Sequence, residues 1–182
     1  MPYRIAALES AEKFVESLDD EMKRRMWDEI GEMELEEEGV KPVVVARKIN
    51  VLAALAYANI DGELSERLMP LIKNEAWSVR EASCLALARL GEKAALSRKL
   101  VDALSTAYLH IIQDRKFAKC RTAGYRIIRG LLLRAERGGE AKELVIVYKE
   151  QWESKVKRGL GDNDVGVTGL ASECLVKLNQ IG

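Results

Sequence analysis

The feature that most constrains this chain is a helix-turn-helix pattern in residues 68–91, LMPLIKNEAWSVREASCLALARLG. Pro70 lacks an amide N–H, so it must kink the first helix or sit in its first turn. After a polar interruption, Ser78 and Glu81 fit a capping box at the start of a second helix. Apolar residues then recur every three or four positions up to Gly91, which is well placed for a left-handed helix end. The stretch therefore predicts the end of one helix, a turn and a complete second helix.

The second-helix pattern occurs four times along the chain. Its equivalent positions are 33, 41 and 47 residues apart: Ala46, Val79, Cys120 and Val167. Each interval holds one further amphipathic segment, at about 63–73, 95–113 and 140–158. Because one pair of antiparallel helices cannot bury both of its faces, we expect successive pairs to stack and to form a shared core.

At these residues the chain resembles the HEAT-repeat family. The family's proline, polar turn, Val-Arg pair and spaced apolar residues are matched by Pro70, Asn74, Val79-Arg80, Ala82 and Leu87. The last copy, DNDVGVTGLASECLVKL, keeps the acidic turn but has Thr168 where the family has arginine. The resemblance covers residues 41–182. It implies an α-solenoid whose second helices line a concave face, a surface that in this family usually binds proteins and less often nucleic acid.

The predicted fold class is therefore all-α, an α-α superhelix or solenoid of about four antiparallel helix pairs plus one extra N-terminal helix. No segment shows the sustained alternation of a β-strand. We expect a single HEAT-like domain over residues 1–182, in which 1–40 form acidic N-terminal helices and 41–182 form the helical repeats.

Charge is unevenly distributed along the chain. The first 40 residues hold 13 acidic and 5 basic side chains, a balance of −8, although the whole chain has 29 of each, so the remainder carries +8. Two helices are predicted in the acidic part, at about 4–17 and 20–37. The second would pair with a helix at 43–59, and the first would act as a polar cap. The carboxylates form either a solvated face or a docking face for a basic partner or for the chain's own basic segment.

That basic segment runs from Arg115 to Arg137, with eight basic residues and one acidic residue, Glu136. If the segment is one helix, five of its cations fall near a single line opposite the apolar side chains, and they are the candidate binding residues: Arg115, Lys119, Arg126, Arg129 and Arg137. A line about 33 Å long could lie beside several phosphates. An acidic protein surface or plain solvent are the other two interpretations.

Three arginines occupy equivalent positions in the repeats: Arg47, Arg80 and Arg121. The resemblance to HEAT repeats implies that each bonds to the turn of its own or of a neighbouring unit. The forked guanidinium suits that task, because it can donate to turn carbonyls and to an aspartate together. We therefore expect these arginines to belong to the scaffold rather than to a binding site.

Patterns for catalysis and metal binding are sparse. His110 is the single histidine, which disfavours a histidine-based triad and excludes a His-rich zinc site. The three cysteines lack paired spacing and are expected to be buried as small apolar residues: Cys84, Cys120 and Cys174. GLGDNDVG at 159–166 follows a helix rather than a strand, so we interpret it as a turn with Asp162 and Asp164 as helix caps. We predict no enzymatic activity, no cofactor and no metal.

The predicted function is a non-enzymatic protein-protein interaction module, a HEAT-like scaffold or adaptor in the cytoplasm that binds another protein. The leading alternative is a nucleic-acid-binding solenoid that uses the basic line. A third is self-association through the acidic N-terminal pair of helices and the basic line. A DNA-repair glycosylase on HEAT-like repeats is a minor alternative whose catalytic motif has no match here. Trp77 and Trp152 are instead expected to fill gaps between units. No apolar run approaches the ~20 residues of a membrane span, so no membrane partner is expected.

Overall fold

The computed structural model describes residues 2–30, 34–35, 39–55 and 61–181. Within these ranges the chain forms ten α-helices and one short 3-10 helix, η1, without a strand, which confirms the all-α prediction. In chain order they are α1 (Pro2–Glu16), α2 (Asp20–Ile30), α3 (Pro42–Leu55), α4 (Asp61–Leu68), η1 (Pro70–Lys73), α5 (Trp77–Lys93), α6 (Arg98–Ile111), α7 (Ala118–Ala135), α8 (Glu140–Ile146), α9 (Lys149–Gly159) and α10 (Val165–Gln180). Parts of two predicted helices lie outside the described residues: 31–33, 36–37 and 56–59.

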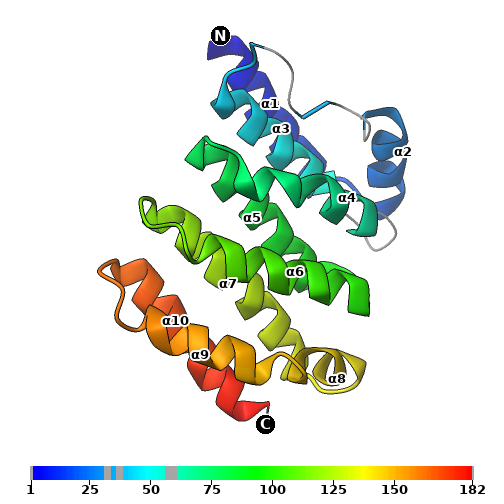
Figure 1. Cartoon of the computed structure of the whole chain (residues 1–182). Helices are drawn as coiled ribbons and strands as arrows, with labels where there is room; N and C mark the ends of the chain where they lie inside the picture. Colours follow the sequence, from blue (N-terminus) through cyan, green and yellow to red (C-terminus); the bar gives the residue numbers. More distant parts are fainter. Residues whose placement is uncertain (1, 31–33, 36–38, 56–60, 182) are drawn as a thin grey trace.

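Four of these helices, α3, α5, α7 and α10, form a row in which each contacts the next. Helices α4, α6 and α9 pack against this row and lie in front of it in Figure 1. α1 packs along α3 at one end of the row, and α10 lies at the other end. The helices of this row carry most of the basic segment and the repeated arginines.

The N-terminal helices differ from the predicted arrangement in one respect. The helix expected at 20–37 does contact α3 as α2, but α1 has the more extensive contact with α3. α2 ends at Ile30, and Glu34 and Leu35 are not helical. Val15 of α1 is fully buried, so α1 is anchored in the core rather than acting only as a polar cap.

The capping box predicted at Ser78 and Glu81 is wrong. α5 begins at Trp77 with Ala76 as its N-cap, and no side chain caps it. The side-chain hydrogen bond of this turn lies before the helix instead, where the Asn74 side-chain oxygen accepts the Ala76 amide at 2.9 Å. Ser78 therefore lies inside the first turn of the helix, past the position from which a cap acts.

Gly91 does not end α5 as predicted, since the helix continues to Lys93 and Gly91 has no positive φ. Its role is close packing. A Cβ at this position would lie 3.3 Å from Leu104 Cδ1 and 3.5 Å from the Ile127 carbonyl oxygen. Pro70 behaves as expected, because it begins the separate η1 turn after α4.

The single helix predicted at 140–158 is divided into α8 and α9. Val147 and Tyr148 join them, and the Tyr148 amide donates to the Val145 carbonyl at 3.0 Å in a tight turn. The run of β-branched residues 145–147 favours this break, because branched side chains crowd the preceding helical turn. The bend places the Tyr148 ring against Trp152, with ring centroids 5.4 Å apart.

A continuous cluster of buried apolar side chains extends from Val15 in α1 to Ile181 after α10. Trp152 is fully buried within it, and its indole N–H donates to the Ser105 hydroxyl at 2.9 Å. The three cysteines are also buried and unpaired, as predicted. The apolar periodicity of the sequence thus identifies the core side of the repeat helices correctly.

Candidate functional site

Two of the three repeated arginines, Arg80 and Arg121, form links between successive turns of the row. The Arg80 guanidinium donates to the Asp114 carboxylate through Nε at 3.1 Å and Nη2 at 2.6 Å. Its Nη1 donates at 2.8 Å to the carbonyls of both Asn74 and Glu75, in the turn before α5. Arg80 therefore joins its own turn to the turn that precedes α7.

Arg121 repeats this geometry one helix further along. Its Nε and Nη2 each donate at 2.7 Å to Asp162, and its Nη1 donates to the Asp114 carbonyl at 2.8 Å. The Arg121 and Asp162 side chains are only 16% and 15% exposed. The guanidinium holds the pKa of Asp162 below its usual range. Burial alone would raise the pKa of Asp114, but the bonds from Arg80 and from backbone amides outweigh it and lower that pKa.

Arg47, the first of the three equivalent arginines, has a different carboxylate partner. Its Nη2 lies 2.6 Å from Glu9 of α1. The turn before α5 offers the uncharged Asn74 where the two following turns offer Asp114 and Asp162. The scaffold role predicted for these arginines is thus confirmed in detail at two positions, and at the third the carboxylate comes from α1.

The prediction that one helix carries the whole basic line is wrong. α7 spans only Ala118–Ala135, so Arg115 precedes it and Arg137 follows it. Arg129 lies on α7, but its Nε donates to Glu173 of α10 at 2.8 Å. Sequence periodicity placed these residues on a common line, yet it could not show where the helix ends or which carboxylates α10 supplies.

The side chains of five cations of the basic segment form neither an ion pair nor a hydrogen bond with another described residue. These residues are Arg115, Lys116, Lys119, Arg126 and Arg137. All five are exposed. Lys119 does have an aromatic contact, because its Nζ lies 5.3 Å from the centre of the Trp77 ring. Two of the five candidate residues, Lys119 and Arg126, line a common hollow.

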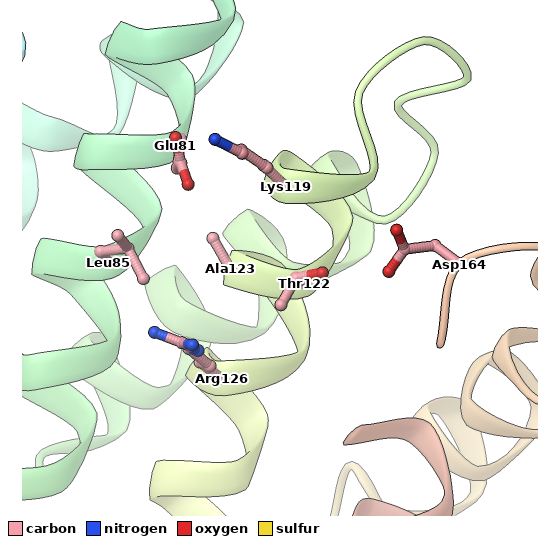
Figure 2. A pocket seen from close by; sticks show the side chains of 7 residues that line it. All are labelled: Glu81, Leu85, Lys119, Thr122, Ala123, Arg126 and Asp164. Carbon is pink, nitrogen blue, oxygen red and sulfur yellow. The ribbon is translucent and has the colours of Figure 1, made fainter. Parts of the chain in front are cut away.

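That hollow is a groove of about 220 Å³ between α5 and α7, shown in Figure 2. Leu85 and Ala123 supply its apolar surface, and Arg126 extends toward α5 beside Leu85 (Figure 2). At the other end Lys119 faces Glu81 (Figure 2). Its remaining lining residues are Thr122 and Asp164. We name this feature, with its seven lining residues, the α5–α7 groove.

The carboxylate of Asp164 is already engaged in the fold. Asp164 is the N-cap of α10, where its Oδ1 accepts the Val167 amide at 3.1 Å, as the sequence predicted for a helix cap. Asp162, the other predicted cap, instead binds Arg121 and accepts the Asp164 amide at 3.0 Å. The geometry therefore gives these neighbouring carboxylates structural roles.

The aromatic residues near the groove pack against one another at its edge. Trp77 and Phe117 stack with ring centroids 5.7 Å apart and planes at 20°. Arg80 covers the Phe117 ring at 5.5 Å, on the side of the scaffold links. This cluster joins the starts of α5 and α7, which agrees with the predicted gap-filling role of Trp77. The stacking itself was not foreseen, because residues 77 and 117 are far apart in sequence.

A second charged hollow lies beside α1. It has a volume of about 450 Å³ and is lined entirely by charged residues: Glu9, Glu12, Lys13, Glu16, Arg47 and Arg89. Arg89 of α5 is bonded to α1 at two points, 3.6 Å from Glu12 and 3.2 Å from Glu16. The described acidic side chains of α1 therefore face Arg47 and Arg89, not the cations of the basic segment.

The described residues offer little for catalysis or for a metal. His110 is exposed and lines an outer hollow with Met69 and Ile72. Burial raises the pKa of Cys120 to about 11 and that of Cys174 to about 12, which keeps these thiols protonated. Among the described side chains, no group of three or more His, Cys, Asp or Glu could hold a metal ion. In the same part of the chain, no helix is long and apolar enough to cross a bilayer.

Comparison with known proteins adds no family assignment. No family model matches the chain, and no curated protein matches it significantly. One similar solved structure is the crystal structure of an engineered protein, a Northeast Structural Genomics Consortium target. It is 13% identical, the alignment covers 97% of this chain and 98% of that one, and the TM-score is 0.43.

Proposed function

We propose that the chain is a HEAT-like α-α superhelix of about four antiparallel helix pairs plus an N-terminal helix, and that it works as a non-enzymatic protein interaction module. The architectural part is supported by the row of α3, α5, α7 and α10 and by the repeated links Arg80–Asp114 and Arg121–Asp162. A stack of this kind presents a long side surface, and binding along that surface needs no catalytic group.

The interaction surface in this proposal is the α5–α7 groove. The observation that carries it is the state of Arg126, which is exposed, lies beside the apolar Leu85 and forms no ion pair with any described residue. Arg121 and Arg129, on the same helix, are bonded within the fold. A protein partner fits because protein interfaces combine apolar contact with arginine side chains that pair across the boundary.

Affinity capture with the full chain tests this function. The tagged protein and its Arg126→Glu variant are used to capture proteins from cells of its own source. Arg98→Glu, on the exposed start of α6, is the matched control. We expect the captured proteins to fall at least about tenfold with Arg126→Glu and to stay unchanged with Arg98→Glu. Capture that is indifferent to Arg126→Glu, or substrate turnover by the pure chain, would contradict the proposal.

Nucleic-acid binding remains the second candidate. It is favoured by four exposed cations that form no ion pair with a described residue: Arg115 before α7, Lys119 and Arg126 on α7, and Arg137 after it. It is disfavoured because a duplex presents phosphates along the whole groove, where the carboxylates of Glu81 and Asp164 would oppose some of them. A protein partner needs to place only one carboxylate, on Arg126. A labelled duplex titrated at about 50 mM salt distinguishes the two functions. Binding that weakens steeply with salt and with Arg126→Glu would replace the protein partner by nucleic acid.

A further inference from the structure

Helix α1 shows how an acidic helix seats on the row. Its carboxylates Glu9, Glu12 and Glu16 follow the spacing i, i+3, i+7, which places them on one face of the helix. All three pair with arginines of the row, Glu9 with Arg47 and the other two with Arg89. The apolar anchor is Val15, which is fully buried. An acidic face with one apolar side chain is therefore already accommodated by this surface.

The surface that holds α1 continues into the α5–α7 groove. Arg89 lines the hollow beside α1, and Leu85, four residues earlier on α5, lines the groove. Residues four apart lie on the same face of a helix, so the two hollows adjoin along α5. α1 occupies the first position along this face, and the described residues leave the second one open.

The charged residues of the α5–α7 groove differ in whether they have a partner. Lys119 faces Glu81 across the groove (Figure 2), and Asp164 caps α10. Arg126 has no such counterpart in the described part of the chain. Its guanidinium is the group that an incoming carboxylate would pair with, and Leu85 offers an apolar contact in the same groove.

We propose that the α5–α7 groove binds an acidic helix of a partner protein, which lies next to α1 and places one carboxylate on Arg126 and one apolar side chain on Leu85. The inference rests on the proposed interaction function and adds the chemical class of the partner. The Arg126 guanidinium supplies the charge complementary to a partner carboxylate, and α1 shows the same kind of pairing within this molecule.

The test uses a labelled peptide with the sequence of residues 2–17, which carries the α1 pattern, and the intact chain. Fluorescence anisotropy measures its binding to the wild-type chain, to Arg126→Glu, to the milder Arg126→Gln and to the control Arg98→Glu. We expect at least about tenfold weaker binding with Arg126→Glu, an intermediate loss with Arg126→Gln and no change with Arg98→Glu. A peptide with Gln at positions 9, 12 and 16 should bind at least about tenfold more weakly.

Three results would overturn the proposal. The Gln peptide could bind as well as the Glu peptide, the wild-type affinity could be unaffected by both Arg126 variants, or a duplex could displace the peptide. A dimer of the chain that depends on Arg126, seen by sedimentation equilibrium, would make a second copy the occupant instead. If capture in cells depends on Arg126 while the peptide fails to bind, the interaction function stands and only the acidic helix is wrong.

Discussion

At the scale of single residues, arginines at equivalent positions of the sequence pattern pair with different carboxylates, depending on which one lies nearby. Arg80 and Arg121 each reach the aspartate of the next turn, whereas Arg47 pairs with Glu9 of α1. In the last copy Thr168 replaces the arginine, and its hydroxyl donates to the Val165 carbonyl at 3.1 Å. The chain of turn-to-turn links therefore stops at α10.

The Arg121–Asp162 pair should contribute measurably to stability. Because both partners are largely buried and share two hydrogen bonds, we expect Arg121→Ala or Asp162→Ala to lower the free energy of unfolding by about 2 kcal/mol. The double variant should lose less than the sum of the single ones, since the two changes remove one interaction. Urea unfolding of the wild type, the two single variants and the double variant measures these free energies. Arg98→Ala is the control, and we expect it to change stability by less than about 0.5 kcal/mol. Strict additivity would contradict a direct link.

The lowered pKa of Asp162 gives this contribution a pH dependence. A carboxyl whose folded pKa lies below its unfolded value stabilises the fold above the unfolded value of about 3.9 and loses that effect as the pH falls toward the folded one. We therefore expect the stability gap between wild type and Asp162→Asn to be largest near neutral pH. It should shrink below about pH 4 in urea titrations. A gap that stays constant down to about pH 2 would show that the charge of Asp162 is not involved.

At the scale of elements, α5 and α7 approach closely through glycine. At Gly130 an added Cβ would lie 2.8 Å from Glu92 Cγ, 3.3 Å from the Glu92 amide nitrogen and 3.4 Å from the Ala88 carbonyl oxygen. Gly169 on the open side of α10 has no atom within 4 Å of that position. Packing therefore requires a glycine at position 130 but not at position 169, so Gly169 is a suitable control for substitutions of Gly130.

Substitution by alanine should act in opposite directions at these positions. Gly130→Ala forces α5 and α7 apart, so we expect a net loss of about 1–2 kcal/mol of unfolding free energy after the gain in helix propensity. Gly169→Ala should increase stability by about 0.5–1 kcal/mol, because it meets no neighbour and reduces the freedom of the unfolded chain. Thermal and urea unfolding measure both. If Gly130→Ala were also stabilising, the close approach of α5 and α7 would be disproved.

The elements could be predicted from sequence to the extent that they depend on local periodicity. Apolar spacing located the second helices and the buried cysteines, because one face of each helix is buried along its length. Helix ends were less predictable, since they depend on contacts with distant residues. α5 continues past Gly91, where the helix packs closely against Leu104 of α6. Arg121, near the start of α7, bonds to Asp162, which is 41 residues away in sequence.

At the scale of the whole molecule, the acidic N-terminus and the basic remainder meet at only part of their surface. α1 neutralises Arg47 and Arg89, and it leaves Arg126 open. The sequence predicted both charged segments and named Lys119 and Arg126 among five candidates. The sequence could not show that Arg129, unlike Lys119 and Arg126, is paired within the fold, because its partner Glu173 lies on another helix.

The attachment of α1 should depend on salt more than the rest of the row does. Its ion pairs are partly exposed and are therefore screened, whereas α5 and α7 are held by apolar packing. We expect amide exchange in α1 to become about fivefold faster when NaCl is raised from about 50 mM to about 1 M, which corresponds to about 1 kcal/mol of screened ion-pair energy. Exchange in α7 should change little. A uniform response of both helices would argue that the ion pairs do not hold α1.

In the proposed function the α5–α7 groove, and not the opposite side of the molecule, contacts another protein. Site-specific photo-crosslinking in cells of the protein's own source tests it most directly, with p-benzoylphenylalanine at Thr122 in the groove or at the exposed Asp102 on α6. We predict a discrete protein adduct from position 122 that disappears with Arg126→Glu, and none from position 102. An adduct only from position 102, or none from position 122, would exclude the α5–α7 groove as the contact surface.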